Sequence, residues 1–141
     1  GMSLLFSDCC NPIPGDPIIG HMKEGTGLMI HTHDCKILSK EVDQTTELLD
    51  VAWSENTDKL FTVTISLVVT DHKGVLARVA TKIANTNSNI KNASAKPGDS
   101  EAYGTIIFTI EVQDRLHLAK VMRELRRVPD VIRISRQKHH F

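Results

Sequence analysis

Long apolar runs, aromatic residues and cysteines are all scarce in this sequence of 141 residues. No stretch approaches the roughly 20 apolar residues that a membrane-spanning helix needs, and no leader of basic and apolar residues opens the chain, so we expect a cytoplasmic protein. Gly1 before Met2 is typical of an expression scar, and the abrupt opening indicates a piece of a longer protein. Three cysteines, an odd number, argue against a disulfide framework and leave metal binding or buried thiols.

Neither sign of charge is in excess, since the chain has 17 basic and 17 acidic side chains. Their distribution is uneven: residues 1–58 carry three basic and ten acidic side chains, residues 59–113 six and four, and residues 114–141 eight and three. The step near Asp58 predicts a boundary between a first module, residues 1–56, and a second module, residues 59–141. We expect no DNA binding from the balanced total. Six basic residues near the C-terminus could line a phosphate surface or be ordinary solvated charges: Arg123, Arg126, Arg127, Arg133, Arg136 and Lys138.

The second module opens with a strand that leads into a helix. Apolar residues alternate with mostly hydroxyl side chains from Phe61 to Thr70, which predicts a strand with one buried face. Apolar residues then recur at helical spacing from Val75 to Ala84, after a turn at Gly74. Such a junction leaves free backbone N–H groups at the helix start, which could hold a small anionic or zwitterionic ligand. The alternative is a plain connection in which Gly74 supplies a positive φ.

The remaining elements of the second module complete a recognisable order. We expect strands over Ile90–Lys96 and Tyr103–Val112, with a turn at Pro97–Ser100 between them. Asp114 is expected to cap a helix that Pro129 stops, and a last short strand follows at 131–134. The order strand, helix, strand, strand, helix, strand predicts a ferredoxin-like α+β sandwich with both helices on one face.

This fold is shared by several functional classes, so the fold alone does not assign a function. An RNA-recognition module would need aromatic side chains on the open face of the sheet. Phe61 and Phe108 belong by parity to the helix-facing set, which leaves Tyr103 as a lone candidate. A copper chaperone would need paired cysteines in the loop after the first strand, and that loop reads Asp-His-Lys-Gly.

The first module is expected to be a small α/β unit rich in turns. Prolines and glycines in NPIPGDPIIG predict tight turns before a short strand at Pro17–Ile19. A second strand is expected at Leu28–Ile30, a brief helix from Asp34 to Ser39, and a closing strand after Leu48. A unit of this size with so few large apolar groups is short of core, which favours a metal as a stabilising element.

Four residues of the first module are candidate metal ligands. His31 and Cys35 are four residues apart, so a strand-to-helix corner can direct both side chains to one ion. Cys9 and Cys10 are adjacent and lack the two-residue spacing of ordinary zinc sites. His33 could replace His31. The alternatives are a zinc site and a core of buried free thiols.

The run CCNPIPGDPIIG, followed by KEGTGLMIH and DC, resembles the conserved-cysteine module of long RelA/SpoT homologues. That module is also called the zinc-finger or ribosome-intersubunit domain, and these proteins are bifunctional enzymes that make and hydrolyse (p)ppGpp. In the family it is followed by an ACT domain, which residues 59–141 also resemble. The closing run DRLHLAKVMRELRRVPDVIRISR is similar to the SpoT-type branch. The resemblance covers residues 5–138 and implies a zinc ligand set of Cys9, Cys10, His31 and Cys35.

The ACT resemblance implies a regulatory amino-acid site where the first strand-to-helix loop meets the second strand of a paired domain. The first strand of the second module is long, and the fold leaves sheet edges open to pairing with a second copy, so we expect a homodimer through the ACT domains. We also expect a pocket suited to a small apolar amino acid such as valine or leucine, with Asp71 facing the ammonium group. The candidate ligand-binding residues are Asp71, His72, Lys73, Gly74, Val75, Leu76, Asn89 and Ile90.

The family resemblance implies a non-catalytic regulatory region that acts on catalytic domains upstream of it. The full-length protein is expected to be a GTP pyrophosphokinase and (p)ppGpp 3′-pyrophosphohydrolase of the bacterial stringent response. Nothing in this sequence provides the phosphate-binding or paired-metal groups that such chemistry demands. The alternative is an interaction module that docks the enzyme on ribosomal RNA and protein. The acidic first module weakens that alternative and the basic C-terminal end supports it.

Overall fold

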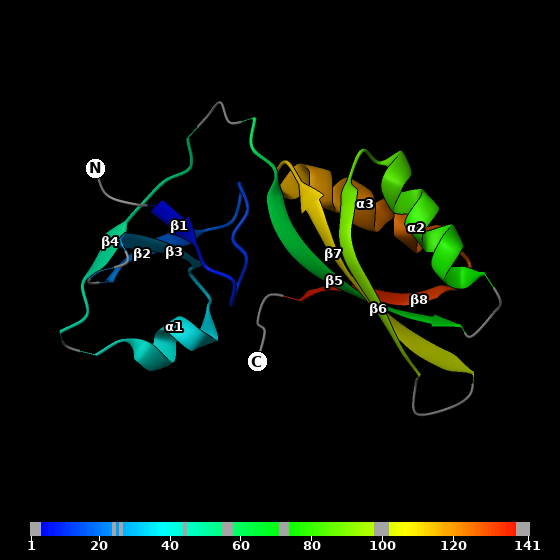
Figure 1. Ribbon diagram of the computed structural model, residues 1–141, viewed down its shortest axis with the longest axis horizontal. Coiled ribbons are helices and arrows are strands. Elements are labelled where there is room, and N and C mark those ends of the chain that lie inside the picture. Colours follow the sequence, from blue (N-terminus) through cyan, green and yellow to red (C-terminus); the bar gives the residue numbers. More distant parts are fainter. Residues whose placement is uncertain are drawn as a thin grey trace.

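The computed structural model describes residues 4–23, 25, 27–43, 45–54, 58–70, 74–97 and 102–137. These residues form two four-stranded sheets that stand side by side (Figure 1). The first sheet has the order β1-β3-β2-β4 and one helix, α1. Its elements are β1 (Leu4–Phe6), β2 (Ile18–Lys23), β3 (Gly27–Thr32), α1 (Lys36–Glu41) and β4 (Leu48–Asp50).

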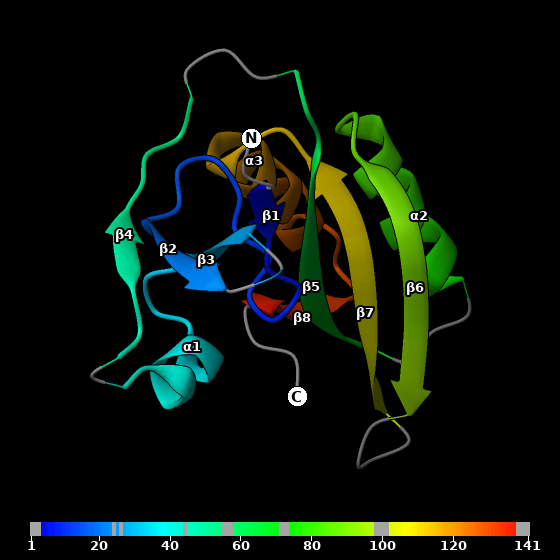
Figure 2. The same ribbon diagram turned by 60° about the vertical axis from the view of Figure 1, so that its left-hand side comes forward.

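The second sheet is fully antiparallel and has the order β6-β7-β5-β8. Figures 1 and 2 show α2 and α3 covering one of its faces. This confirms the expected α+β class and the ferredoxin-like order of elements. The elements are β5 (Phe61–Thr70), α2 (Val75–Asn85), β6 (Asn89–Pro97), β7 (Tyr103–Val112), α3 (Arg115–Arg126) and β8 (Val131–Gln137).

Strand β5 lies in the centre of this sheet, and its alternating sequence gives it one buried apolar face. Five alternate apolar residues of β5 are at most 7% exposed and pack against the buried stripes of α2 and α3: Phe61, Val63, Ile65, Leu67 and Val69. Pairing with β7 runs over all ten residues, and β8 pairs on the other side. The open edges of the sheet are therefore β6 and β8, and a copy of this chain cannot pair with β5.

The first module differs from expectation in two details. The pattern did not predict β1, which pairs in parallel with β3. The helix α1 begins after Cys35 and not at Asp34, because the Cys35 Sγ accepts a hydrogen bond from the Leu38 N–H at 3.4 Å and takes the capping position. The core of this module is small, as expected, and consists of Cys10, Cys35 and Leu38.

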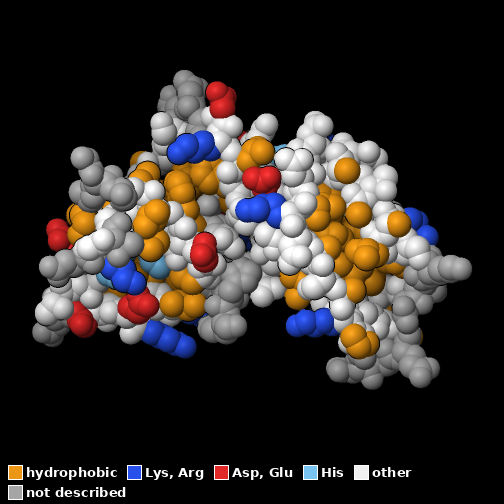
Figure 3. All heavy atoms as spheres, viewed as in Figure 1, with side chains coloured by type: hydrophobic (Ala, Val, Ile, Leu, Met, Phe, Trp, Pro, Cys, Tyr) orange, Lys and Arg blue, Asp and Glu red, His pale blue; other side chains and the backbone are white. Residues whose placement is uncertain are grey.

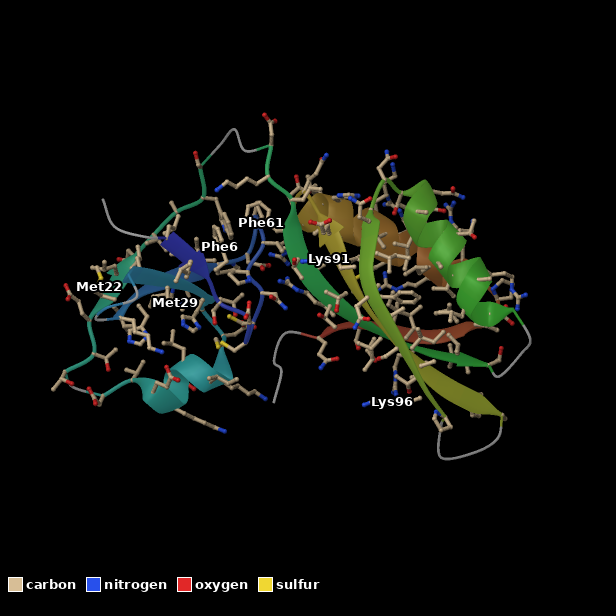
Figure 4. The ribbon with its side chains drawn as sticks, in the orientation of Figure 1. Phe6, Met22, Met29, Phe61, Lys91 and Lys96 are labelled. Carbon is tan, nitrogen blue, oxygen red and sulfur yellow. The ribbon has the colours of Figure 1, made fainter. Side chains whose placement is uncertain are left out.

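Three apolar side chains of the first module pack against the core of the second module: Phe6, Ile13 and Trp53. Ile13 is fully buried within the core of the second module. The ring of Phe6 stacks on Trp53 at 5.6 Å between centroids and meets the edge of Phe61 at 5.4 Å. Figure 4 shows Phe6 and Phe61 lying close together across the junction. The two modules therefore share one apolar core.

A buried ion pair completes this junction. The Asp16 carboxylate accepts two hydrogen bonds from the Arg136 guanidinium, at 2.8 and 2.7 Å, and one from the Ile13 N–H at 2.9 Å. The two side chains are 2% and 10% exposed. The sequence placed Arg136 among basic residues expected at the surface. In the structure it is buried between the modules, and the paired carboxylate offsets the cost of burying its charge.

None of the helices in the part of the chain that the structure describes is long and apolar enough to cross a membrane. Asp71, His72 and Lys73 of the expected ligand loop lie outside the described residues, as does most of the expected turn after Pro97.

We predict that Asp16→Ala lowers the free energy of unfolding by about 3–5 kcal/mol, because it leaves the Arg136 guanidinium buried without its partner. Asp8→Ala is the matched control, since Asp8 is an exposed carboxylate on the same loop. Circular dichroism during urea titration measures both variants. Equal stability of the two variants would show that the ion pair contributes nothing to the fold.

Candidate functional site

The four cysteine and histidine residues singled out from the sequence come together in the first module. One ligand atom from each of Cys9, Cys10, His31 and Cys35 lies within 4.8 Å of all the others. The Cys9 Sγ is 3.5 Å from the Cys35 Sγ, 3.5 Å from the His31 Nδ1 and 3.9 Å from the Cys10 Sγ. The Cys10 Sγ is 3.8 Å from the same His31 nitrogen.

A tight turn allows the two adjacent cysteines to face the same point. The Asn11 N–H donates to the Ser7 carbonyl at 2.9 Å and closes a turn around both cysteines. Asn11 itself has a φ of 45°, a left-handed conformation that asparagine tolerates better than most residues. The other two ligands come from the expected corner, since His31 lies near the end of β3 and Cys35 precedes α1.

The spacing of the ligand atoms fits a tetrahedral zinc ion. Zinc–sulfur bonds of about 2.3 Å and zinc–nitrogen bonds of about 2.0 Å place tetrahedral ligands about 3.8 Å apart for two sulfurs, and about 3.5 Å apart for sulfur and nitrogen. The separations around the Cys9 Sγ, 3.5 to 3.9 Å, fall close to these values. The cluster therefore has the donor types of a structural zinc site, and the separations around Cys9 match the dimensions of one.

Hydrogen bonds to the sulfurs add to this fit. The Cys10 Sγ accepts from the Thr32 N–H at 3.3 Å, and the Cys35 Sγ accepts from the Leu38 N–H. Such donors stabilise the thiolate form that binds a metal. Burial works in the other direction in the metal-free protein, because it raises the pKa of Cys10 to about 12 and also raises the pKa of Cys9. Burial lowers the pKa of His31, so this imidazole is neutral at pH 7 and free to act as a ligand.

The spare imidazole considered from the sequence is not part of this cluster. His33 is exposed and lies outside the group of four. The ring centroid of His21 lies 6.2 Å from that of His31. The alternative of buried free thiols uses the same contacts, since separations below 4.0 Å also suit weak hydrogen bonds among thiols.

The second candidate site is the start of α2, of which the structure describes Gly74, Val75 and Leu76. Gly74 caps the helix with a φ of 84°, a conformation that favours glycine, and among the described residues no side-chain hydrogen bond caps the helix start. Val75 is buried, whereas Leu76 is 46% exposed. The apolar surface beside this helix start is thus open.

The two halves of the expected amino-acid site lie at opposite ends of the sheet. Asn89, at the start of β6, is level with Glu111 and so with Thr62, near the start of β5. Gly74 follows Thr70, at the other end of that strand. Ten residues of strand span about 30 Å, so a single chain cannot close a pocket from Gly74 and Asn89.

Sequence reasoning missed the residues that join the modules, above all Ile13, Asp16 and Arg136. The proline and glycine pattern around Asp16 predicted turns, which the structure has, but nothing in that pattern identified a distant partner. The only signal was the opposite charge of the two modules, which favours contact between them without naming residues.

Comparison with known proteins covers both modules. The RelA/SpoT RIS domain family matches residues 1–54, and the ACT domain family matches residues 57–136. The bifunctional (p)ppGpp synthase/hydrolase SpoT of Escherichia coli K12 is 35% identical over 139 residues, which is 99% of this chain and 20% of that protein. The GTP pyrophosphokinase of the same organism is 32% identical over 125 residues, 88% of this chain and 17% of that protein.

Among solved structures, the ACT domain from the GTP pyrophosphokinase of Chlorobium tepidum is 24% identical, with a TM-score of 0.49. It covers 56% of this chain and 100% of that chain. The chain spans about a fifth of the length of the curated relatives it matches. Its matches are to their RIS and ACT regions and not to their catalytic domains. The chain therefore belongs to the ACT domain family and constitutes a RIS–ACT region, the C-terminal regulatory part of a RelA/SpoT homologue.

Proposed function

We propose that this region senses a small apolar amino acid between two ACT domains and thereby controls the upstream catalytic domains of a (p)ppGpp synthase/hydrolase. One observation carries the proposal: the start of α2 and the edge strand β6 are both open. All nine residues of β6 are exposed. Figure 3 shows apolar side chains at the surface where β6 and α2 lie in Figure 1.

The register of the sheet supports a dimer through β6. If two β6 strands pair antiparallel about a twofold axis, the Gly74 end of one chain meets the Asn89 end of its partner at one end of the joined sheet. Backbone N–H groups at the start of α2 would then hold the ligand carboxylate. Leu76, with Ile90 of the second copy, would surround a short apolar side chain, which favours valine or leucine.

We expect millimolar valine or leucine to shift the amide resonances of residues 74–76 and 89–90, and glutamate to shift none of them. Leu76→Asp should weaken valine binding about tenfold or more, because burial of a leucine side chain is worth about 1.5–3 kcal/mol. Leu116→Asp is the matched control, since Leu116 lies in the first turn of α3 and is 82% exposed. Titration by NMR, with sedimentation to follow dimer formation, measures both effects. Valine that moves no amide of the dimer would disprove the sensing proposal.

We also propose that Cys9, Cys10, His31 and Cys35 bind one structural zinc ion. The close spacing of their ligand atoms, 3.5 to 3.9 Å around the Cys9 Sγ, and the small core around them support this proposal. A metal would supply folding free energy that so few buried apolar groups do not.

Purified protein is expected to contain one zinc ion per chain, and chelation should lower its melting temperature. Cys35→Ser should lose most of the metal while keeping α1, because serine is itself a good helix N-cap. His33→Ala, which removes an imidazole outside the cluster, should retain it. Elemental analysis and thermal scans measure these effects. Metal content near zero with an unchanged melting curve would favour buried thiols.

The apparent zinc affinity should rise with pH. Burial raises the pKa of Cys10 to about 12, so its thiol is protonated at neutral pH without metal, and zinc must displace that proton. Lower pH therefore favours the metal-free form. Competition with a chelator of known pH dependence measures the slope. An affinity that does not change between pH 6 and pH 8 would contradict thiolate ligation.

Docking on the ribosome is a second candidate function, and the outer face of the helices favours it. A groove of about 540 Å³ between α2 and the end of α3 contains Arg78, Lys82 and Arg127. Two of these charges are partly offset, since Arg78 pairs with Asp130 at 2.6 Å and Arg127 with Glu124 at 3.2 Å. Lys120 and Arg123 on α3 are exposed and add positive charge to this side.

If this face binds ribosomal RNA, sedimentation with ribosomes should be strong at low salt and fall steeply as salt rises. Replacing Lys120 and Arg123 together by glutamate should weaken it further, whereas Lys36→Glu on α1 should change it little. Ribosome binding that does not change with salt concentration or in either variant would exclude a phosphate contact on this face.

A further inference from the structure

The loop from Ser7 to Pro17 belongs to two sites at once. It connects β1 with β2, and both of its cysteines are in the candidate metal cluster. From Asn11 onward the same loop faces the ACT domain. The metal contact and the ACT contact lie on adjacent residues. Cys10 belongs to the cluster, and the carbonyl of the next residue, Asn11, accepts a hydrogen bond from the Arg136 Nη2 at 3.0 Å.

The ACT side of the loop is held at successive residues. Ile13 is fully buried in the ACT core. The Pro14 carbonyl accepts from the backbone N–H of Arg115 at 2.8 Å, and the Gly15 carbonyl accepts from the Arg115 Nη1 at 3.2 Å. Asp16 then binds the Arg136 guanidinium.

The contact to Arg115 satisfies a donor that the ACT domain does not satisfy itself. Arg115 is the first residue of α3, where backbone N–H groups have no partner within the helix. The Arg115 N–H donates to the carbonyl of Pro14 in the RIS domain. The His117 N–H instead donates to the Asp114 side chain at 2.8 Å, within the ACT domain. The loop therefore completes the start of an ACT helix.

The metal side of the loop is equally constrained. Cys10 is fully buried, and its Sγ accepts from the Thr32 N–H. A zinc ion on Cys9 and Cys10 would also bind His31 in β3 and Cys35 at the cap of α1, and so connect this end of the loop to both elements. Fixing one end of so short a loop reduces the entropy lost when the other end docks.

We propose that metal occupancy of the cysteine–histidine cluster and docking of the RIS domain on the ACT domain are energetically coupled through the loop Ser7–Pro17. Zinc in the cluster stabilises the docked arrangement, and loss of zinc frees the ACT domain from the RIS domain. The inference rests on the proposed zinc site. Because coupling between two sites is reciprocal, weakening the docking weakens zinc binding by the same factor.

Amide hydrogen exchange of the full chain tests one direction of this coupling. The Arg115 N–H should exchange about tenfold faster after chelation, the size of a typical coupling, because its protection comes from the RIS loop. The His117 N–H, two residues along the same helix turn, should keep its rate because its partner is within the ACT domain. Acceleration at Arg115 alone separates undocking from general unfolding.

Zinc affinity of an interface variant tests the other direction. Arg136→Gln removes the buried one of the two arginines that pair with Asp16, the other being Arg115 at 3.6 Å, and touches no candidate metal ligand. It should therefore weaken zinc binding about tenfold. Arg127→Gln is the matched control, since Arg127 is an exposed arginine whose ion pair lies within the ACT domain. Competition with a chromophoric chelator measures both. If Arg136→Gln does not fold, Gly15→Ala replaces it, because a Cβ there would lie 3.0 Å from the Arg115 side chain.

The outcomes are distinct. Faster exchange at Arg115 with weaker zinc binding by the interface variant supports coupling. Tight zinc binding with unchanged Arg115 exchange and unchanged affinity in the variant overturns the coupling and leaves the zinc site standing. A wild-type chain that binds no zinc overturns both.

Discussion

A buried carboxylate holds two small folding units together. Asp16 is almost inaccessible, and its oxygens are occupied by Arg136 and by the backbone of its own loop. A group of this kind is costly to bury unless its partners are in place, so the ion pair fixes one relative position of the domains. Ile13 and the ring cluster of Phe6, Trp53 and Phe61 supply the apolar contact that the ion pair by itself does not.

The RIS domain depends on its surroundings more than the ACT domain does. Its own core contains two cysteines and one leucine, whereas the ACT core is built on β5 and both helices. Two further features support it: the candidate ligand cluster within the domain and the ACT surface against which the domain packs. The loop that contains Cys9, Cys10 and Asp16 takes part in both, and this explains how one short segment of irregular backbone can matter to both domains.

Periodicity predicted what is local in this structure. The alternation in β5, the capping of α3 by Asp114 and the corner from His31 to Cys35 each depend on neighbouring residues, so the sequence reveals them. The short strand β1 has no alternating pattern and exists because β3 offers it an edge. The pairing of Asp16 with Arg136 spans most of the chain and is a property of the assembled fold. For the same reason the sequence could not show that β5 is central and β6 is the open edge.

The ring cluster at the junction has a spectroscopic consequence. Trp53 is the single tryptophan of the chain, and its indole N–H donates to the Asp16 carbonyl at 2.9 Å while its ring stacks on Phe6. The intrinsic fluorescence of the protein is therefore dominated by one chromophore in one place. Its emission wavelength and quenching report the polarity of the junction between the domains. Folding of the rest of the ACT sheet contributes almost nothing to that signal.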